Sequence, residues 1–356
     1  MQTLIRLKQA RALQLAALAV TVVAGASAVA AGSGNAAQTD AARKSDPPNG
    51  AHFKRPTLAH GELKIKGTQA NDKIALRLKA GEPNVLQVDL DDDGTAEFEF
   101  NRAAVKTIAV RARGGDDVVR IDEVNGTFTN AIPTTIDGGR GNDNLAGGTG
   151  AEKLLGGKGD DSVDGNRGDD AAVLGPGDDT FVWDPGDGSD TIEGESGIDT
   201  MLFNGANAAE QVTLTANGNR LTFFRDPVAI TMDTAGVEIV DFRALGGADT
   251  VTVNDLTGTD VTDVSVDLAG TPNGATGDGA IDRVIVNATN GVDTIDVSGD
   301  AAGLKVVGLA ATTRILHQEP ASDRLEINTL DGADTVTSAG LAAGAVRFFL
   351  DGILVP

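Results

Sequence analysis

The sequence predicts an all-β fold in which a parallel β-roll of short repeats is flanked by β-solenoid-like strand segments. From residue 62 onward, apolar and polar residues alternate at a period of two, as half-buried strands require. Glycine is abundant, with 46 residues, whereas aromatic residues make up only 3% of the chain. No helical periodicity is found after the N-terminal residues. A sandwich-like arrangement of hairpins is the alternative for the flanking segments.

Residues 1–31 have the pattern of a secretory signal peptide. Arg6, Lys8 and Arg11 form a basic start, residues 12–25 are apolar, and Ala26-Ser27-Ala28 offers small residues for cleavage. The alternative is an uncleaved membrane anchor, for which this apolar run is short. No later segment is long and apolar enough to span a bilayer, so we expect a secreted or cell-surface protein. Loss of the three basic residues would take the net charge from −23 to −26.

The rest of the chain divides by composition into four segments. Residues 32–61 are rich in Ala, Ser, Asp and Pro without a strand or helix period, which predicts a flexible linker. Residues 62–137 are expected to form an N-terminal β segment, residues 138–202 the β-roll, and residues 203–356 a C-terminal β domain.

A weak repeat is shared by the two flanking segments. Each copy has two apolar strand residues, a turn rich in Gly, Asn and Asp, an Asp, and a second strand. The aligned carboxylates are Asp72, Asp117, Asp249, Asp293 and Asp334. We interpret them as turn residues that hydrogen-bond their own backbone, and not as metal ligands. The unit favours a solenoid into which the roll is inserted.

A strict repeat occupies residues 138–202, where seven nonapeptides follow in register with one insertion at Trp183-Asp184. Position 4 is Gly in every copy. Position 6 is always a carboxylate: Asp143, Glu152, Asp161, Asp170, Asp179, Asp190 and Asp199. Position 8 is always apolar: Leu145, Leu154, Val163, Ala172, Phe181, Ile192 and Met201.

Each position of the nonapeptide has a physical role. Glycine permits a tight turn over positions 1–6 and leaves backbone carbonyls unshielded. Positions 7–9 form a short strand with an inward side chain, so two nonapeptides close one coil. Position-6 residues from alternate copies then stack in two rows, one with Asp143, Asp161, Asp179 and Asp199, the other with Glu152, Asp170 and Asp190.

Carboxylates and carbonyls are the hard oxygen ligands that Ca²⁺ prefers, so we expect several Ca²⁺ ions between the stacked turns. The carbonyl ligands are expected near Gly138, Gly141, Gly156, Gly159, Gly165, Gly168 and Gly177. The alternative is a glycine-rich turn array that binds nothing, but it would leave stacked carboxylates to repel one another.

The nonapeptides resemble the hemolysin-type calcium-binding repeat of the RTX family, whose pattern is G-G-x-G-x-D-x-U-x. The resemblance covers residues 138–202 and implies a parallel β-roll that folds when Ca²⁺ binds. RTX proteins often leave the cell by an uncleaved C-terminal signal. This chain differs from that pattern, because it has an N-terminal signal pattern and ends in FFLDGILVP.

A second acidic motif, Asp89, Asp91, Asp93 and Gly94, has the spacing that opens an EF-hand loop. Its twelfth position is Phe100 instead of Glu, and the residues that follow the motif alternate like a strand. We therefore expect a hairpin turn, with a weak cation site as the alternative.

Composition also limits the partners and the chemistry. The strongly acidic chain would be repelled by phosphate backbones, so nucleic acid is excluded as a partner. With no Cys, three His, and neither H-E-x-x-H nor G-x-S-x-G, we expect a binding protein with a structural or surface-interaction role and not an enzyme. The alternative is a secreted hydrolase of extracellular polymer that uses a carboxylate pair in a cleft beside an aromatic side chain.

Overall fold

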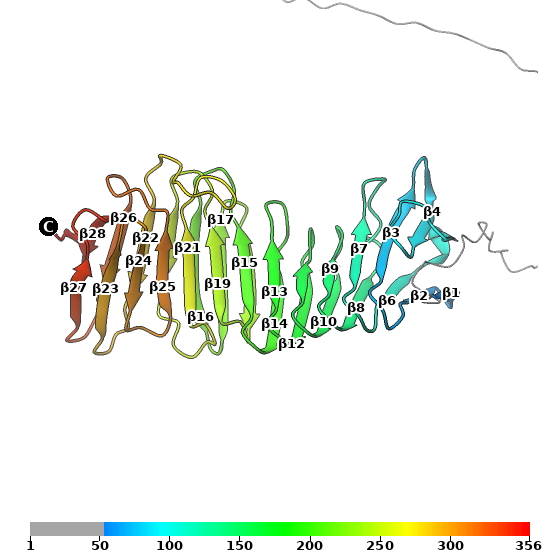
Figure 1. The fold of residues 1–356 in the computed structure, drawn as a ribbon, viewed down its shortest axis with the longest axis horizontal. Coiled ribbons are helices and arrows are strands. Elements are labelled where there is room, and N and C mark those ends of the chain that lie inside the picture. Colours follow the sequence, from blue (N-terminus) through cyan, green and yellow to red (C-terminus); the bar gives the residue numbers. More distant parts are fainter. Residues whose placement is uncertain (1–52) are drawn as a thin grey trace, which may run out of the picture. The chain divides into compact units, whose positions relative to one another are not determined.

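The computed structural model describes residues 53–356, which form two large β-sheets that face each other across one core (Figure 1). The expected signal peptide and residues 32–52 of the expected linker lie outside the described residues. In the described part of the chain, one short 3₁₀-helix, Arg102–Ala104, is the sole helical element. No helix in residues 53–356 is long and apolar enough to cross a membrane.

Sheet one contains fifteen strands. In spatial order they are β1 (Lys54–Ala59), β2 (Glu62–Lys66), β6 (Thr107–Arg111), β8 (Thr134–Arg140), β10 (Lys153–Lys158), β12 (Ala171–Pro176), β14 (Thr191–Ser196), β18 (Ile230–Ala235), β17 (Arg220–Asp226), β16 (Gln211–Asn217), β20 (Thr250–Val253), β22 (Arg283–Asn287), β26 (Arg324–Asn328), β28 (Arg347–Leu350) and β29 (Ile353–Leu354).

Sheet two contains fourteen strands. In spatial order they are β27 (Thr335–Leu341), β23 (Thr294–Asp300), β24 (Gly303–Val307), β25 (Thr312–Leu316), β21 (Asp263–Asp267), β19 (Ile239–Arg243), β15 (Thr200–Asn204), β13 (Thr180–Trp183), β11 (Ser162–Asp164), β9 (Asn144–Ala146), β7 (Val118–Asp122), β3 (Lys73–Lys79), β4 (Glu82–Asp89) and β5 (Phe98–Asn101).

The chain alternates between the two sheets, so each coil contributes one strand to each. β10 pairs in parallel with β8 and β12 in sheet one, while β11 pairs in parallel with β9 and β13 in sheet two. The register is one coil per 18 residues in the roll, as in the pairing of Leu154 with Ile136 and Ala172. The expected β-roll within a β-solenoid is therefore confirmed.

Antiparallel meanders interrupt the coils at three places. β3, β4 and β5 form one meander, β16, β17 and β18 a second, and β23, β24 and β25 a third. In the second meander, the strand order in the sheet is the reverse of the order in the chain. The last strand, β18, therefore pairs with β14 of the preceding coil, and the first strand, β16, pairs with β20 of the following coil. Antiparallel pairing in the flanking segments is thus confined to these insertions and to the terminal pairs β1–β2 and β28–β29.

The core is a continuous column of inward side chains. The seven apolar position-8 residues of the roll are all at most 1% exposed. Aromatic side chains enter the column near the end of the roll and continue beyond it. Trp183 stacks on Phe203 with ring centroids 3.9 Å apart, and Phe223 and Phe242 pack against Phe203. This aromatic cluster fills the core where the first strands after the roll join it.

Three boundaries expected from composition differ from the structure. Residues 54–59, placed in the flexible linker, form β1, which pairs antiparallel with β2. Its residue Pro56 is accommodated because β1 is an edge strand. In addition, β8 crosses the boundary at residue 138 and β15 crosses that at residue 203, so the three β segments share continuous sheets.

Candidate metal centre

Row one is the line of position-6 carboxylates that precede strands of sheet two: Asp143, Asp161, Asp179 and Asp199. Each is at most 3% exposed. The amide of Asp143 donates to Asp161 Oδ1 at 2.7 Å, and that of Asp161 donates to Asp179 Oδ1 at 2.7 Å. The amide of Asp179 donates to Asp199 Oδ1 at 2.9 Å. One oxygen of each carboxylate therefore links it to the preceding coil.

Row two lies on the other side of the coils, before strands of sheet one, and consists of Glu152, Asp170 and Asp190. The amide of Glu152 donates to Asp170 Oδ1 at 2.6 Å, and that of Asp170 donates to Asp190 Oδ1 at 2.8 Å. Glu152, the longer side chain, folds back so that its Oε2 accepts the amide of Gly148 at 2.7 Å. The two rows are those that the nonapeptide spacing predicts.

The second oxygen of every carboxylate in the two rows is buried and has no hydrogen-bond partner. These atoms are Oδ2 of Asp143, Asp161, Asp170, Asp179, Asp190 and Asp199, and Oε1 of Glu152. Buried polar atoms are normally satisfied, and an orphaned carboxylate oxygen is costly. A repeated set of such oxygens fits a bound hard cation.

Glycines leave room for these oxygens. A Cβ added to Gly138 would lie 2.4 Å from Asp143 Oδ2 and 2.7 Å from the carbonyl oxygen of Gly156. At Gly165, a Cβ would lie 2.3 Å from Asp170 Oδ2. Position-1 glycine therefore keeps open a space bordered by a carboxylate oxygen, and at Gly138 also by a carbonyl of the next coil.

Position-4 glycines stack their carbonyls in a second line. A Cβ on Gly159 would lie 2.3 Å from the Gly141 carbonyl oxygen, and a Cβ on Gly177 would lie 1.9 Å from that of Gly159. On the row-two side, a Cβ on Gly168 would lie 1.7 Å from the Gly150 carbonyl oxygen. Side chains are thus excluded along the faces where the turns meet.

The exposed side chains at position 5 form a ladder of hydrogen bonds that runs in the opposite direction to those of rows one and two. Asn142 Oδ1 accepts the amide of Asp160 at 3.0 Å, and Asp160 Oδ1 accepts the amide of Asp178 at 3.0 Å. Here the earlier coil accepts from the later one, whereas in rows one and two the later coil accepts. The backbone amides of positions 5 and 6 in these turns therefore have hydrogen-bond partners within the protein.

Burial disfavours the charged form of the row carboxylates and raises their pKa values. The pKa of Asp161 is raised to about 7, first by burial and then by the charges of Asp143 and Asp179, while its backbone hydrogen bond opposes the shift. Burial raises the pKa of Asp170 to about 9 and that of Asp190 to about 7. The charges that add to these shifts all come from carboxylates.

Row one extends one coil upstream of the predicted roll, to Asp117. This residue is 1% exposed, its Oδ1 accepts the amide of Asp72 at 2.7 Å, and its Oδ2 has no partner. Its own amide donates to Asp143 Oδ1 at 2.8 Å. The interpretation of Asp117 as a residue that bonds its own turn is wrong. The signal was the sequence ARGGDDVVR (residues 112–120), which keeps Gly at position 4 and Asp at position 6.

Of the other aligned Asp residues, two hydrogen-bond their own turn and two accept an amide from another coil. Asp72 accepts the amide of Thr68 and Asp293 accepts that of Thr289, so both bond their own turns as expected. Asp249 and Asp334 instead accept amides from other coils, those of Glu210 and Asp293. For these two the interpretation as purely local turn residues is wrong.

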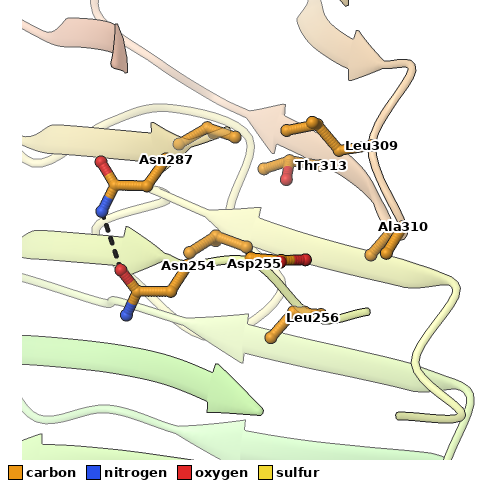
Figure 2. Close-up of a pocket in the computed structure, with 10 residues that line it drawn as sticks. Asn254, Asp255, Leu256, Asn287, Leu309, Ala310 and Thr313 are labelled. Carbon is orange, nitrogen blue, oxygen red and sulfur yellow. Dashed lines mark hydrogen bonds between the residues drawn. The ribbon is translucent and has the colours of Figure 1, made fainter. Parts of the chain in front are cut away.

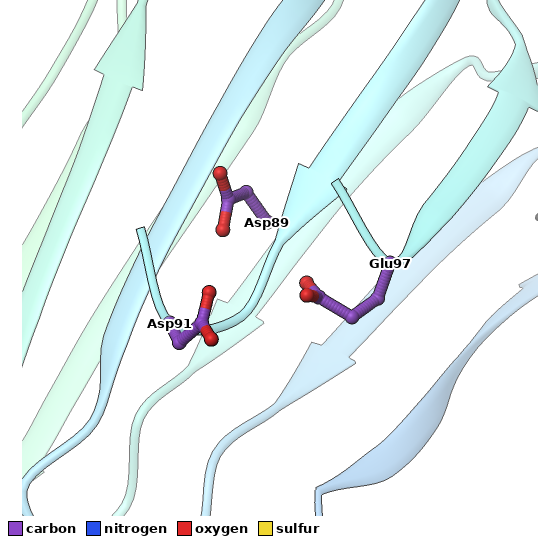
Figure 3. A group of neighbouring side chains, drawn as sticks. All are labelled: Asp89, Asp91 and Glu97. Carbon is purple, nitrogen blue, oxygen red and sulfur yellow. The ribbon is translucent and has the colours of Figure 1, made fainter. Parts of the chain in front are cut away.

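The Asp89 motif forms the turn between β4 and β5, which pair antiparallel, so the expected hairpin is confirmed. Ligand atoms of Asp89, Asp91 and Glu97 lie within 4.8 Å of one another (Figure 3). However, Asp89 is ion-paired with Arg77 at 2.6 Å and accepts the amide of Gly94 at 3.0 Å. Its charge is already compensated by the protein.

A small cavity lies beside β20 and β22, lined by residues that include Asn254, Asn287 and Thr313 (Figure 2). Its volume is about 10 Å³, room for about one water molecule. Asn287 Nδ2 donates to Asn254 Oδ1 at 2.7 Å, and Asn328 Nδ2 donates to Asn287 Oδ1 at 2.8 Å. This asparagine ladder joins neighbouring coils and is structural.

Comparison with known proteins identifies the repeat. The family model of the RTX calcium-binding nonapeptide repeat matches in four copies, over residues 135–151, 146–181 and 185–201. The roll of this chain therefore consists of RTX calcium-binding repeats, as their resemblance predicted. No curated protein matches the chain.

Among solved structures, the crystal structure of the extracellular lipase LipA from Serratia marcescens is similar at 14% sequence identity and a TM-score of 0.19. The match covers 60% of this chain and 43% of the lipase chain. This chain thus spans less than half of that protein, and the likeness is too low to carry a functional argument.

Proposed function

We propose that this protein is exported, that its roll folds on binding several Ca²⁺ ions, and that the folded roll acts as a structural or surface-interaction scaffold. The observation that carries the proposal is the two rows of buried carboxylates, each with one oxygen that no donor reaches. Calcium-binding RTX repeats in the same residues support it.

The chain's own residues account for the coupling between binding and folding. Both the position-6 carboxylates and the turn carbonyls would bind the ions. The carboxylates are those of rows one and two: Asp143, Glu152, Asp161, Asp170, Asp179, Asp190 and Asp199. Bound Ca²⁺ would supply positive charge next to the buried carboxylate oxygens that accept no hydrogen bond. Because unfolded chain has no such arrangement of oxygens, the free energy of binding adds to that of folding.

Export would place the roll where calcium is abundant. Extracellular modules typically bind Ca²⁺ with dissociation constants of about 10⁻⁴ to 10⁻³ M. The expected signal peptide would bring the chain to that environment, and the calcium-poor interior of the cell would keep the roll unfolded for transport. Mass spectrometry of the exported protein should find a mature N-terminus close to residues 29–32. An N-terminus that retains Arg6 and Lys8 would contradict the export proposal.

The test of calcium-dependent folding is a titration of calcium-stripped protein, followed by far-ultraviolet circular dichroism and limited proteolysis. We expect Ca²⁺ to increase the strand signal and to protect residues 138–202 from protease, while equal Mg²⁺ does not. Unchanged strand signal and unchanged protection on removing calcium would refute the proposal.

We propose further that the protein binds and scaffolds, and that it is not a hydrolase. A groove of about 400 Å³ gathers carboxylates from Glu193, Glu195, Glu238 and Asp260. No aromatic side chain is among the residues that line it, and Glu193 is held by Arg220 at 2.7 Å. A sugar-cleaving cleft would need an aromatic platform, which is missing from the residues that line this groove.

The decisive measurement for this part is a hydrolase screen of calcium-loaded protein on peptide, ester, glycoside and phosphoester substrates. We expect no turnover above that of a Glu195→Gln and Glu238→Gln double variant. Turnover that persists through purification and disappears in the double variant would establish the hydrolase alternative.

A further inference from the structure

A third row of carboxylates lies outside the residues that the repeat model matches. Row three consists of Glu210, Asp249, Asp282 and Asp323, which precede β16, β20, β22 and β26 in sheet one. The amide of Glu210 donates to Asp249 Oδ1 at 2.7 Å, that of Asp249 to Asp282 Oδ1 at 2.8 Å, and that of Asp282 to Asp323 Oδ1 at 3.0 Å. This ladder of amide-to-carboxylate hydrogen bonds is the same as in rows one and two. Within row three, the buried oxygens without a partner belong to Glu210 and Asp249.

Asp249 has the features of a row-one carboxylate in full. It is 2% exposed, its Oδ1 is used by the amide of Glu210, and its Oδ2 is buried without a partner. The turn before it, residues 244–249, reads ALGGAD and keeps Gly at position 4. An unpartnered, buried carboxylate oxygen in an ordered turn is a costly feature unless a ligand uses it.

One charge in row three is already compensated by the protein. Arg225 is 5% exposed, and its Nε donates to Glu210 Oε1 at 2.6 Å while its Nη2 contacts the same oxygen. The guanidinium also lies over the ring of Trp183, 5.2 Å from its centroid. The first member of the row is therefore neutralised by an arginine.

Among the described residues, no basic side chain is paired with the next two members, Asp249 and Asp282. The charges that act on Asp249 are those of Asp282, Glu210 and Asp278. Those that act on Asp282 come from Asp323, Asp278 and Glu319. Asp278 is exposed and links the two turns, because its Oδ2 accepts the amide of Gly247 at 2.6 Å. The interval between the turns of Asp249 and Asp282 thus concentrates negative charge.

We propose that Asp249 and Asp282 hold a calcium ion between their turns, at a site that is separate from the RTX repeats. Oxygen donors select a hard cation, and Ca²⁺ tolerates the irregular geometry of carboxylates and turn carbonyls better than Mg²⁺ does. The site extends the proposed calcium dependence to the C-terminal β segment, and it does not require the roll to bind calcium.

The test counts the ions bound by the full chain in equilibrium dialysis against radioactive calcium. Asp249→Asn keeps the shape and the acceptor for the Glu210 amide but removes the charge. We expect it to bind one ion fewer than the wild type, or to bind that ion at least tenfold more weakly. Asp255→Asn is the matched control, because Asp255 is exposed and in the same part of the chain. The control should bind as the wild type does.

A second measurement separates this site from the roll. Asp161→Asn should lose ions in the roll and keep the ion at Asp249, whereas Asp249→Asn should do the reverse. In calcium-free protein, Asp249→Asn should raise the melting temperature, because an uncompensated buried charge is removed. If Asp249→Asn does not fold, Asp282→Asn provides the same test from the other turn. Wild-type stoichiometry and affinity in a folded Asp249→Asn or Asp282→Asn variant would overturn the proposal.

Discussion

Each carboxylate in rows one and two uses its two oxygens differently. In Asp161, Oδ1 accepts the amide of Asp143, which fixes the spacing of the turns, and Oδ2 meets no donor. A side chain that only satisfied turn amides could be Asn. The charge is unfavourable for folding without a cation, so its presence at seven repeated positions supports the proposed ligand role.

The pH dependence of calcium-free stability follows from the raised pKa values. Asp161 and Asp170 have pKa values of about 7 and about 9 in the folded protein, against an ordinary value of 3.8. The folded state then binds more protons than the unfolded state over this range, so stability decreases as pH rises from about 4 to about 9. Denaturant unfolding of calcium-stripped protein should give a lower free energy of unfolding at pH 8 than at pH 5, by more than about 1.4 kcal/mol. Calcium-saturated protein should show a smaller fall, and an equal fall would count against ligation by these carboxylates.

Neighbouring carboxylates provide a matched pair for the metal role. Asp160 is exposed and bonds the amide of Asp178, whereas Asp161 is buried and has the unpartnered oxygen. We expect Asp161→Asn to weaken calcium binding to the roll at least tenfold, and Asp160→Asn to change it less than about threefold. Isothermal titration calorimetry of both variants checks this. Equal weakening would mean that overall negative charge, and not position 6, attracts the ion.

At the scale of the element, the turns depend on glycines whose missing side chains allow close stacking. Gly159 has a φ of +120°, and an added Cβ would lie 2.3 Å from the Gly141 carbonyl oxygen. The same φ occurs at Gly186, where an added Cβ would meet nothing within 4 Å. Substitution by a residue with a side chain would cost conformational free energy at both positions, because φ is positive at both. A steric clash would add to this cost at Gly159 and not at Gly186.

Alanine substitutions at these two glycines separate the costs. Gly159→Ala should lower the free energy of unfolding of the calcium-loaded protein by about 3 kcal/mol or more, because the stacked carbonyls must move. Gly186→Ala should cost about 1–2 kcal/mol, from its backbone conformation alone. Denaturant unfolding measures both. Similar losses in the two variants would show that stacking contributes little at Gly159.

At the scale of the whole molecule, one continuous core supports regions of different local stability. The roll strands β9 and β11 have three residues each, while β3 and β16 have seven. Short strands bury little apolar surface, and the roll also carries most of the uncompensated buried carboxylates. The roll should therefore open before the segments around β3 and β16.

Hydrogen exchange after calcium removal tests this order. Amides of residues 138–202 should exchange at least tenfold faster without calcium, and those of residues 62–79 should change less. Sodium chloride at 1 M should not restore protection, because the carboxylates are buried and salt screens buried charges poorly. A uniform increase in exchange rate over the described chain would contradict the expected order of opening. Protection of the roll by sodium chloride would indicate that repulsion between surface charges, and not between buried carboxylates, destabilises it.

Sequence alone was sufficient where the pattern is local and periodic. The nonapeptides predict the strand at positions 7–9, the inward residue at position 8, and the two rows of carboxylates. These follow because a turn of constant length, repeated every nine residues, leaves one parallel register that buries every apolar position. The weaker strand–turn–strand unit likewise predicted the solenoid around the roll.

Only the tertiary structure decided which carboxylates outside the repeats join a row. Asp72 and Asp117 occupy equivalent places in the weak repeat. Asp72 bonds its own turn, whereas Asp117 accepts the amide of Asp72 and keeps a buried oxygen without a partner. Glu210 stacks with Asp249, 39 residues away, because the meander of β16, β17 and β18 places β16 beside β20. The partner of Glu210 is Arg225 in that same meander. Coil register and compensating charge depend on contacts between distant segments, and no local spacing in the sequence encodes them.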